Sequence, residues 1–355
     1  MKTYHQSMDE LHFTPEEKEA MTERLLKASQ APVHRVRPLR RMAAVGVAAA
    51  LVLTVGVGAA ATGVLKSAGE AFSEVFGGAP AQTEIIDRIG RPVGASDTAD
   101  GVVITADAIV GDRYSYAIVY TIAREDGKPL AEDLTPNDFG YLPLRFESAD
   151  VDVGQQGGSH GASYFFDADP EDNAVQYVDL RTGDTPLTPG TARASFRNLS
   201  VYTDNDYTKS TPVAQGKWKM RFAFQFEDTS VSLPAGQSFL LNGMEATLDS
   251  VVLSPLSFQV SYTVQQEVQW DNAGGNGQQS AHDREESLRY LESLPVVLTK
   301  RDGTTIDLTS SGGSISPQGG KTVCQKSDIF SSVLSLEEIE SITVADLTFP
   351  LAQGE

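Results

Sequence analysis

The sequence predicts a mainly β, single-pass membrane protein with a short N-terminal cytoplasmic helix and two tandem immunoglobulin-like β-sandwich domains outside. Three observations predict this fold class: an uncharged apolar segment, a change in net charge across it, and a repeated strand pattern after it. The expected parts are a cytoplasmic helical stub at 1–41, a transmembrane helix at 42–65, a stalk at 66–98, a first β domain at 99–232 and a second at 233–355.

The composition excludes several classes of protein. Of the 355 residues, 28 are Lys or Arg and 48 are Asp or Glu, and the resulting net charge of −20 disfavours nucleic acid as a partner. The hydrophobic fraction of 40% is enough for a packed core. The single cysteine, Cys324, excludes intrachain disulfides and multi-cysteine metal sites. We expect a buried thiol there, although an odd cysteine outside the cell can instead pair between chains.

Residues 42–65 have the character of a membrane span. They contain no charged side chain, and Thr54 and Thr62 are the polar ones. A helix of these 24 residues is roughly 36 Å long, enough to cross a hydrocarbon core of roughly 30 Å in the lipid bilayer. Residues 1–41 carry 8 basic and 6 acidic side chains, whereas residues 66–355 carry 20 basic and 42 acidic ones. The positive-inside rule therefore predicts a cytoplasmic N-terminus and extracytoplasmic C-terminal domains at the cell membrane.

The cytoplasmic stub contains a helix start signal, Thr14-Pro15-Glu16-Glu17, with Thr14 at the N-cap and Glu17 closing a capping box. The helix is expected to end near Ser29. One short helix has no core of its own, so its apolar stripe either binds a soluble protein or remains a solvated juxtamembrane face. Under the first interpretation the candidate partner-binding residues are Phe13, Met21, Leu25, Leu26 and Ala28.

Two segments of the C-terminal part resemble each other. Gly101–Ile122 aligns without a gap with Gly243–Val264, at a spacing of 142 residues, with seven identities in 22 positions. Phe196–Val201 and Val344–Phe349 form a second match in the same order, at a spacing of 148. Two ordered matches at similar spacing predict a tandem duplication.

Alternating apolar and polar residues predict about seven short strands in each repeat. One alternating row places its aromatic residues on a single face, which predicts the interior of a sandwich and not a ligand platform. This row is Trp218, Met220, Phe222, Phe224 and Phe226. Further candidate strands lie at 162–166, 174–180 and 192–202, and a helical insertion is expected at 283–294.

No motif predicts catalysis, so we expect no enzyme activity, no catalytic residue, no cofactor and no metal. The one Gly-x-Ser-x-Gly match, Gly157–Gly161, lacks the strand and helix of a nucleophile elbow and is interpreted as a loop. The acidic run Asp167–Asp172 is a candidate Ca²⁺ loop without EF-hand spacing, so a solvated loop is favoured. Trp270 lies in a polar segment and is expected either to contact a glycan or a protein, or to cover a core edge.

The order of these motifs resembles a bacterial family described as domain of unknown function 4179. The resemblance is firm from about Arg40 to Asp126 and looser beyond. It is carried by the Phe13–Glu17 helix start, the basic patch, the span, the run Ile85–Ala95, and Asp100–Asp107 with Tyr116–Tyr120. It implies a single-pass membrane protein of a Gram-positive bacterium, in some cases with the layout of an anti-sigma factor. No catalytic residues are implied, and the His/Cys zinc motif of many anti-sigma domains is absent from this sequence.

These observations predict a membrane-anchored signalling regulator of the anti-sigma type. The cytoplasmic helix would bind a sigma factor, and the outer β domains would sense an envelope signal. The alternative is a cell-surface adhesion or wall-interaction protein whose stub is only an anchor, with an extracellular protein or wall ligand as partner. A third hypothesis, a divergent envelope enzyme, would require a cleft of converging polar groups that the sequence does not show.

Overall fold

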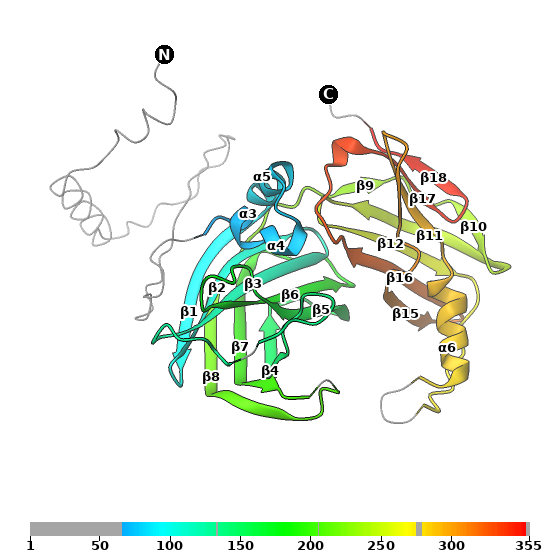
Figure 1. The fold of residues 1–355 in the computed structure, drawn as a ribbon. Helices are drawn as coiled ribbons and strands as arrows, with labels where there is room; N and C mark the ends of the chain where they lie inside the picture. Colours follow the sequence, from blue (N-terminus) through cyan, green and yellow to red (C-terminus); the bar gives the residue numbers. More distant parts are fainter. Residues whose placement is uncertain (1–65, 133, 205, 275–278, 353–355) are drawn as a thin grey trace, which may run out of the picture. The chain divides into compact units, whose positions relative to one another are not determined.

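The computed structural model describes residues 66–132, 134–204, 206–274 and 279–352. Every element within them belongs to one compact unit. The predicted mainly β class is confirmed, because antiparallel strands build four sheets and the helices are short (Figure 1). No helix in these ranges is long and apolar enough to cross a membrane, and the predicted span at 42–65 lies outside them.

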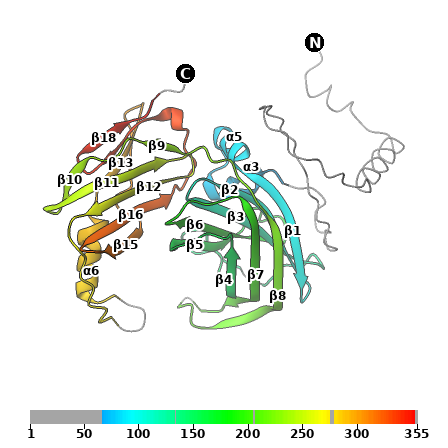
Figure 2. The same cartoon turned by 180° about the vertical axis from the view of Figure 1, so that it is seen from behind.

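Two sheets enclose the core of the first sandwich (Figures 1 and 2). The larger sheet has the order β1-β2-β3-β6-β5, with bounds Arg91–Ala99, Val102–Gly111, Ser115–Arg124, Val175–Gly183 and Ser159–Phe166 in that order. The smaller sheet has the order β4-β7-β8, with bounds Leu144–Asp152, Gly190–Tyr202 and Ser210–Phe224. The candidate strands at 162–166, 174–180 and 192–202 are therefore confirmed as parts of β5, β6 and β7, apart from Ala174, which precedes β6.

The predicted aromatic row lies on β8 and lines this core. Its buried members are Trp218, Met220, Phe222 and Phe224, with the half-buried Phe226 packed against them. The alternate residues Lys219 and Arg221 are exposed. The indole N–H of Trp218 donates to the carbonyl oxygen of Val102 at 2.8 Å, which joins the two sheets through the core. The prediction of a sandwich interior is confirmed for this row.

The second sandwich encloses another core in the same way. Its larger sheet has the order β10-β11-β12-β16-β15, with bounds Ser238–Leu241, Met244–Leu253, Ser257–Val264, Lys321–Ile329 and Gly313–Gln318, and β9 (Val231–Leu233) also pairs with β11. Its smaller sheet has the order β14-β13-β17-β18, with bounds Thr305–Asp307, Val296–Lys300, Ile339–Val344 and Leu347–Pro350. The predicted helical insertion is confirmed as α6 (Ala281–Ser287) followed by a π-helix, η1 (Leu288–Glu292); a short 3₁₀ turn, η2 (Leu336–Glu338), precedes β17.

Residues 66–98 are packed, so the prediction of a stalk is wrong. Three short helices, α3 (Ala68–Ala71), α4 (Ser73–Phe76) and α5 (Pro80–Ile89), cover the outer face of the larger first sheet, and β1 occupies most of the remainder. The rings of Phe72 and Phe76 stack with centroids 5.6 Å apart in this third core. The glycines at 77, 78 and 90 separate packed elements here and do not mark extended chain.

The two matched segments fold into corresponding hairpins, β2–β3 and β11–β12. Each first strand has a bulge at its aspartate, Asp107 or Asp249. In each hairpin this aspartate accepts a hydrogen bond from a threonine of the next strand, at 2.6 Å from Thr121 and at 2.7 Å from Thr263. A bulge re-aims one side chain and is a specific feature, so its recurrence at the spacing of 142 residues is an observation that the duplication hypothesis explains.

The second sequence match holds for only part of its length. Phe196 on β7 pairs with Trp218, and Val344 on β17 pairs with Leu347, so these two residues occupy similar places in their sheets. Beyond them the segments differ: β7 continues to Tyr202, whereas the chain after Val344 turns directly into β18. The duplication therefore stays a prediction, supported at the β2–β3 and β11–β12 hairpins.

The two sandwiches meet at the turns of these corresponding hairpins. Asp112 and Ser254, which are 142 residues apart, each accept hydrogen bonds from two backbone N–H groups of their own turn. The Asp112 carboxylate also accepts hydrogen bonds from the hydroxyls of Ser254 and Ser257, the second at 2.6 Å. All three side chains are buried, so this contact excludes water from a polar network.

Candidate functional site

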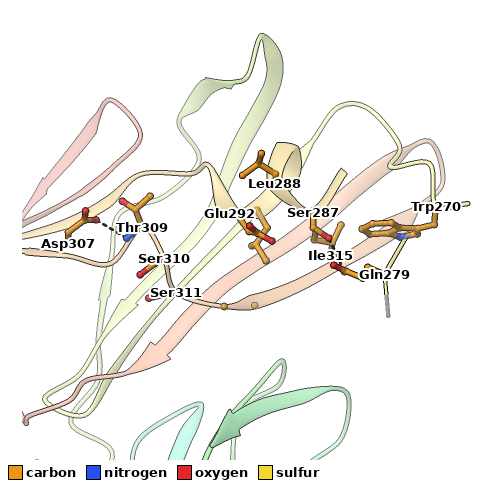
Figure 3. A pocket seen from close by; sticks show the side chains of 13 residues that line it. Trp270, Gln279, Ser287, Leu288, Glu292, Asp307, Thr309, Ser310, Ser311 and Ile315 are labelled. Carbon is orange, nitrogen blue, oxygen red and sulfur yellow. Dashed lines mark hydrogen bonds between the residues drawn. The ribbon is translucent and has the colours of Figure 1, made fainter. Parts of the chain in front are cut away.

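A groove of about 840 Å³ on the second sandwich is the candidate binding site (Figure 3). It lies between the edge strands β14 and β15 and is bordered by the helices α6 and η1. We call it the tryptophan groove, and its main lining residues are Trp270, Leu288, Leu291, Glu292, Asp307 and Ser311. Such a volume falls within the range of about 300–1,000 Å³ typical of small-ligand sites.

Hydrogen bonds from its two neighbours hold Trp270 in place. The Gln269 N–H donates to the carboxylate of Glu286 on α6 at 3.2 Å, and the Asp271 N–H donates to Asp283 on the same helix at 2.9 Å. The half-buried indole packs against the second core and also lines the groove. The expectation that Trp270 covers a core edge is therefore confirmed, and contact with a glycan or a protein stays a prediction.

The helix α6, whose carboxylates accept these hydrogen bonds, has a side-chain cap at its N-terminus. Ser280 is the N-cap of α6, and its hydroxyl oxygen accepts a hydrogen bond from the Asp283 N–H at 2.9 Å. The same hydroxyl donates to Asp271 at 2.7 Å. The cap of α6 and the segment next to Trp270 are thus one hydrogen-bonded unit, which reduces the conformational freedom that a ligand would otherwise have to remove.

A buried lysine lies beneath the groove. Lys326 on β16 has no exposed surface, and its Nζ donates to the carbonyl oxygens of Leu291 at 3.0 Å and Glu292 at 3.3 Å. Burial lowers the pKa of Lys326 to about 8, although the carboxylates of Glu292 and Asp307 oppose this shift. The lysine fixes the end of η1 from below, while the two carboxylates remain exposed at the groove.

The arrangement fits the binding of a ligand. Within the described part of the chain, no group of three or more His, Cys, Asp or Glu is placed to hold a metal ion. The rings of His160 and His282 each lie within hydrogen-bond distance of a backbone carbonyl, at 3.1 Å and 2.7 Å. Ser159 is the first residue of the strand β5, and no helix follows it, so the Gly157–Gly161 match does not form a nucleophile elbow.

The acidic run Asp167–Asp172 forms turns. Asp167 accepts a hydrogen bond from the Asp169 N–H at 3.1 Å, and Asp169 accepts one from the Glu171 N–H at 3.0 Å. Asp172 accepts one from the Ala174 N–H at 2.7 Å. These bonds are local side-chain turns of the kind that aspartate favours, which agrees with the interpretation as a solvated loop.

Sequence reasoning and structure identify different candidate sites. The predicted partner-binding residues, Phe13, Met21, Leu25, Leu26 and Ala28, all lie outside the described residues. Of the tryptophan groove, the sequence singled out Trp270 alone. The polar residues at 309–313 indicate a loop. The sequence does not indicate that this loop lines the same groove as Trp270 and the helix residues.

Comparisons with known proteins add little. No family model and no curated protein matches the chain. One solved structure, described as the crystal structure of the conserved domain protein from Bacillus anthracis, is similar over 72% of this chain and 76% of that chain, with 17% sequence identity and a TM-score of 0.44.

Proposed function

We propose that the protein is a membrane-anchored signalling regulator of the anti-sigma type, with two immunoglobulin-like β domains outside the membrane. The observation that carries this proposal is the uncharged segment 42–65, which separates a stub of net charge +2 from a region of net charge −22. The sequence of the stub predicts a helix with an apolar stripe and no core of its own, so a cytoplasmic partner would stabilise it. The folded outer region presents a groove of about 840 Å³, large enough for a small ligand.

The proposed division of labour has a physical basis. An apolar helix that needs a partner suits the binding of a soluble sigma factor through helix-in-groove contacts. A β module with a preorganised groove suits the recognition of an envelope ligand. A ligand that binds the groove shifts the regulator only if it binds one state of the protein more tightly than the other.

The direct test is capture of sigma factors by the full-length chain in membranes. We expect Leu25→Glu to abolish capture, because it places a charge in the centre of the predicted apolar stripe. Gln30→Glu is the matched control, since it adds the same charge beyond the predicted end of the helix. The proposal fails if the unaltered chain retains no sigma factor, or if both variants lose capture equally.

A second candidate function is interaction with the cell wall, and the tryptophan groove favours it. In this case the stub is an anchor without a signalling role. We expect the full-length chain to sediment with purified wall material and Trp270→Ala to reduce the bound fraction severalfold. Leu240→Ala is the matched control, because Leu240 is exposed and does not line the groove. Normal wall binding by a chain that lacks residues 10–30, with no other change in the cell, would favour this function over the first.

A further inference from the structure

A second groove, of about 370 Å³, lies on the first sandwich. We call it the tyrosine groove, and the side chains used in the argument are Asn137, Tyr141, Arg145, Ser163, Tyr164 and Tyr207. Its floor consists of core residues such as Phe165 and Tyr177. The groove opens between β4 and β5, each of which is the outermost strand of its sheet.

Two aromatic rings of the tyrosine groove stack on each other, and a third ring adjoins them at its border. The rings of Tyr141 and Tyr164 stack with centroids 4.2 Å apart, and Phe139 extends the row with its ring centroid 6.0 Å from that of Tyr141. Phe139, Tyr141 and Tyr207 are 80%, 39% and 50% exposed. Large exposed aromatic residues that gather at one place mark an interaction site, whereas scattered ones do not.

The loop that presents this surface is held in shape. The side-chain oxygen of Asn137 accepts hydrogen bonds from the N–H groups of Phe139 at 2.9 Å and of Tyr141 at 3.0 Å. The Leu142 N–H donates to the carbonyl oxygen of Phe165 on β5 at 2.8 Å. The aromatic row is therefore fixed before any ligand arrives.

The tyrosine groove and the tryptophan groove occupy corresponding edges of the two sandwiches. The orders β1-β2-β3-β6-β5 and β10-β11-β12-β16-β15 place β5 and β15 at the same end of the two larger sheets. The opposite wall is the outermost strand of the smaller sheet in each case, β4 or β14. Of the six large apolar side chains that are exposed among the described residues, four border or adjoin these two grooves: Phe139, Tyr141, Tyr207 and Leu288.

We infer that the tyrosine groove binds a glycan chain and that the tryptophan groove binds another unit of the same kind of polymer. Aromatic faces receive the C–H faces of sugar rings, and phenol, amide and hydroxyl groups at the rim bond sugar hydroxyls. Among the described residues, no carboxylate lines the tyrosine groove and Arg145 forms no ion pair. The favoured sugar unit is therefore neutral, because the exposed carboxylates of Glu292 and Asp307 at the tryptophan groove would repel an acidic unit of the same polymer.

A repeating polymer is the occupant that two corresponding sites favour. One chain that reaches both grooves would bind more tightly than a short fragment, because the second contact becomes intramolecular. The inference deepens the wall-binding candidate and rests on the outward placement of the β domains. It is independent of the sigma-factor proposal, which concerns the stub.

The test is calorimetric titration of the purified full-length chain with soluble β-1,4-linked N-acetylglucosamine oligosaccharides and with solubilised wall glycan. We expect two binding sites per chain for a short fragment. Tyr141→Ala should remove one site or weaken it at least tenfold, Tyr141→Phe should stay within about threefold, and the double variant with Trp270→Ala should lose both sites. Leu240→Ala is the matched control for an exposed apolar residue outside the grooves.

The thermal transition of each variant shows that it is folded, which is expected because Tyr141 and Trp270 both reach the surface. The inference is overturned if the folded, unaltered chain binds neither glycan, or if binding is unchanged in Tyr141→Ala. It is also overturned if a proline-rich peptide, and no sugar, binds in a manner that Tyr141→Ala abolishes. Sigma-factor capture by the same protein, measured in parallel, tells this failure apart from failure of the anti-sigma proposal.

Discussion

Ser115 and Ser257 occupy corresponding positions in the two matched hairpins, and their hydroxyl oxygens lie 3.0 Å apart in the buried contact between the two sandwiches. Three positions earlier, the corresponding residues of the two hairpins differ in chemistry. The carboxylate of Asp112 accepts a hydrogen bond that the hydroxyl of Ser254 donates. Two aspartates there would place like charges together, and two serines would form a weaker bond. The difference between the repeats at this one position therefore favours their direct contact.

The Asp112 network should couple the two sandwiches energetically. In a double-mutant cycle with Asp112→Ala and Ser257→Ala, we expect a coupling of about 1–3 kcal/mol, because each single change leaves a buried polar partner unsatisfied. Urea unfolding of the full-length chain measures it. Asp126→Ala with Lys128→Ala is the control, since this ion pair is exposed to solvent and should couple far more weakly. Additive effects at Asp112 and Ser257 would contradict the observed contact.

Asp107 should make the protein less stable as the pH rises. Burial raises the pKa of Asp107 to about 6, against the opposing hydrogen bond from Thr121. The folded state therefore favours the protonated form of Asp107. Burial of this side chain does not reduce the free energy of unfolding below about pH 4, but the free energy of unfolding falls as the pH rises from about 4 through about 6. We expect Asp107→Asn to gain stability relative to the unaltered chain between pH 4 and pH 7, by up to about 3 kcal/mol.

Unfolding in urea at the two pH values measures this gain. The matched variant is Asp249→Asn, which makes the same substitution at the corresponding, exposed position of the second repeat. Equal pH dependence of the two variants would show that burial of Asp107 does not control it.

Lys326 should produce the opposite pH dependence in the alkaline range. Because burial lowers its pKa to about 8, the charged form is disfavoured in the folded state, and stability falls as the pH decreases from about 10.5 to about 8. The change in the free energy of unfolding caused by Lys326→Met should therefore be more stabilising at pH 7 than at pH 10. The difference between the two pH values should be up to about 3 kcal/mol. Lys300→Met serves as the control at a half-buried surface position. A difference that does not change with pH would show that the ammonium group is solvated.

Cys324 should be inert in the native protein. Its side chain is fully buried, and burial raises the pKa of the thiol to about 12. We expect a water-soluble maleimide to react at least about 100-fold more slowly with the folded chain than with the chain unfolded in urea. Mass spectrometry follows the labelling. Rapid labelling of the folded chain, or a disulfide-linked dimer under native conditions, would contradict the burial.

The sequence was informative where one periodic pattern controls one element. Alternation on β8 identified the inward face, because successive side chains of a strand point to opposite sides. The repeat at Gly101–Ile122 and Gly243–Val264 identified two hairpins that share a bulge and a hydrogen bond. The same kind of reasoning failed at 66–98, because short amphipathic helices separated by glycine resemble a flexible linker until a sheet face is available to cover.

The candidate grooves were mostly beyond sequence reasoning. Trp270 stood out as a single aromatic residue, but Tyr141, Tyr164 and Tyr207 belong to separate segments, and their meeting depends on which strands lie at the sheet edges. Strand order is set by pairings between distant segments, and the local pattern of each strand does not encode it.

The sequence by itself determined the mainly β class, the inward face of β8 and the charge division that predicts the topology, because each depends on local periodicity or composition. The tertiary structure alone decided that residues 66–98 cover a sheet, that Asp112 meets Ser254 and Ser257, and that aromatic residues gather at corresponding edges of both sandwiches. These features depend on contacts between residues far apart in the chain, and such contacts are selected by packing and by the burial of polar groups with their partners.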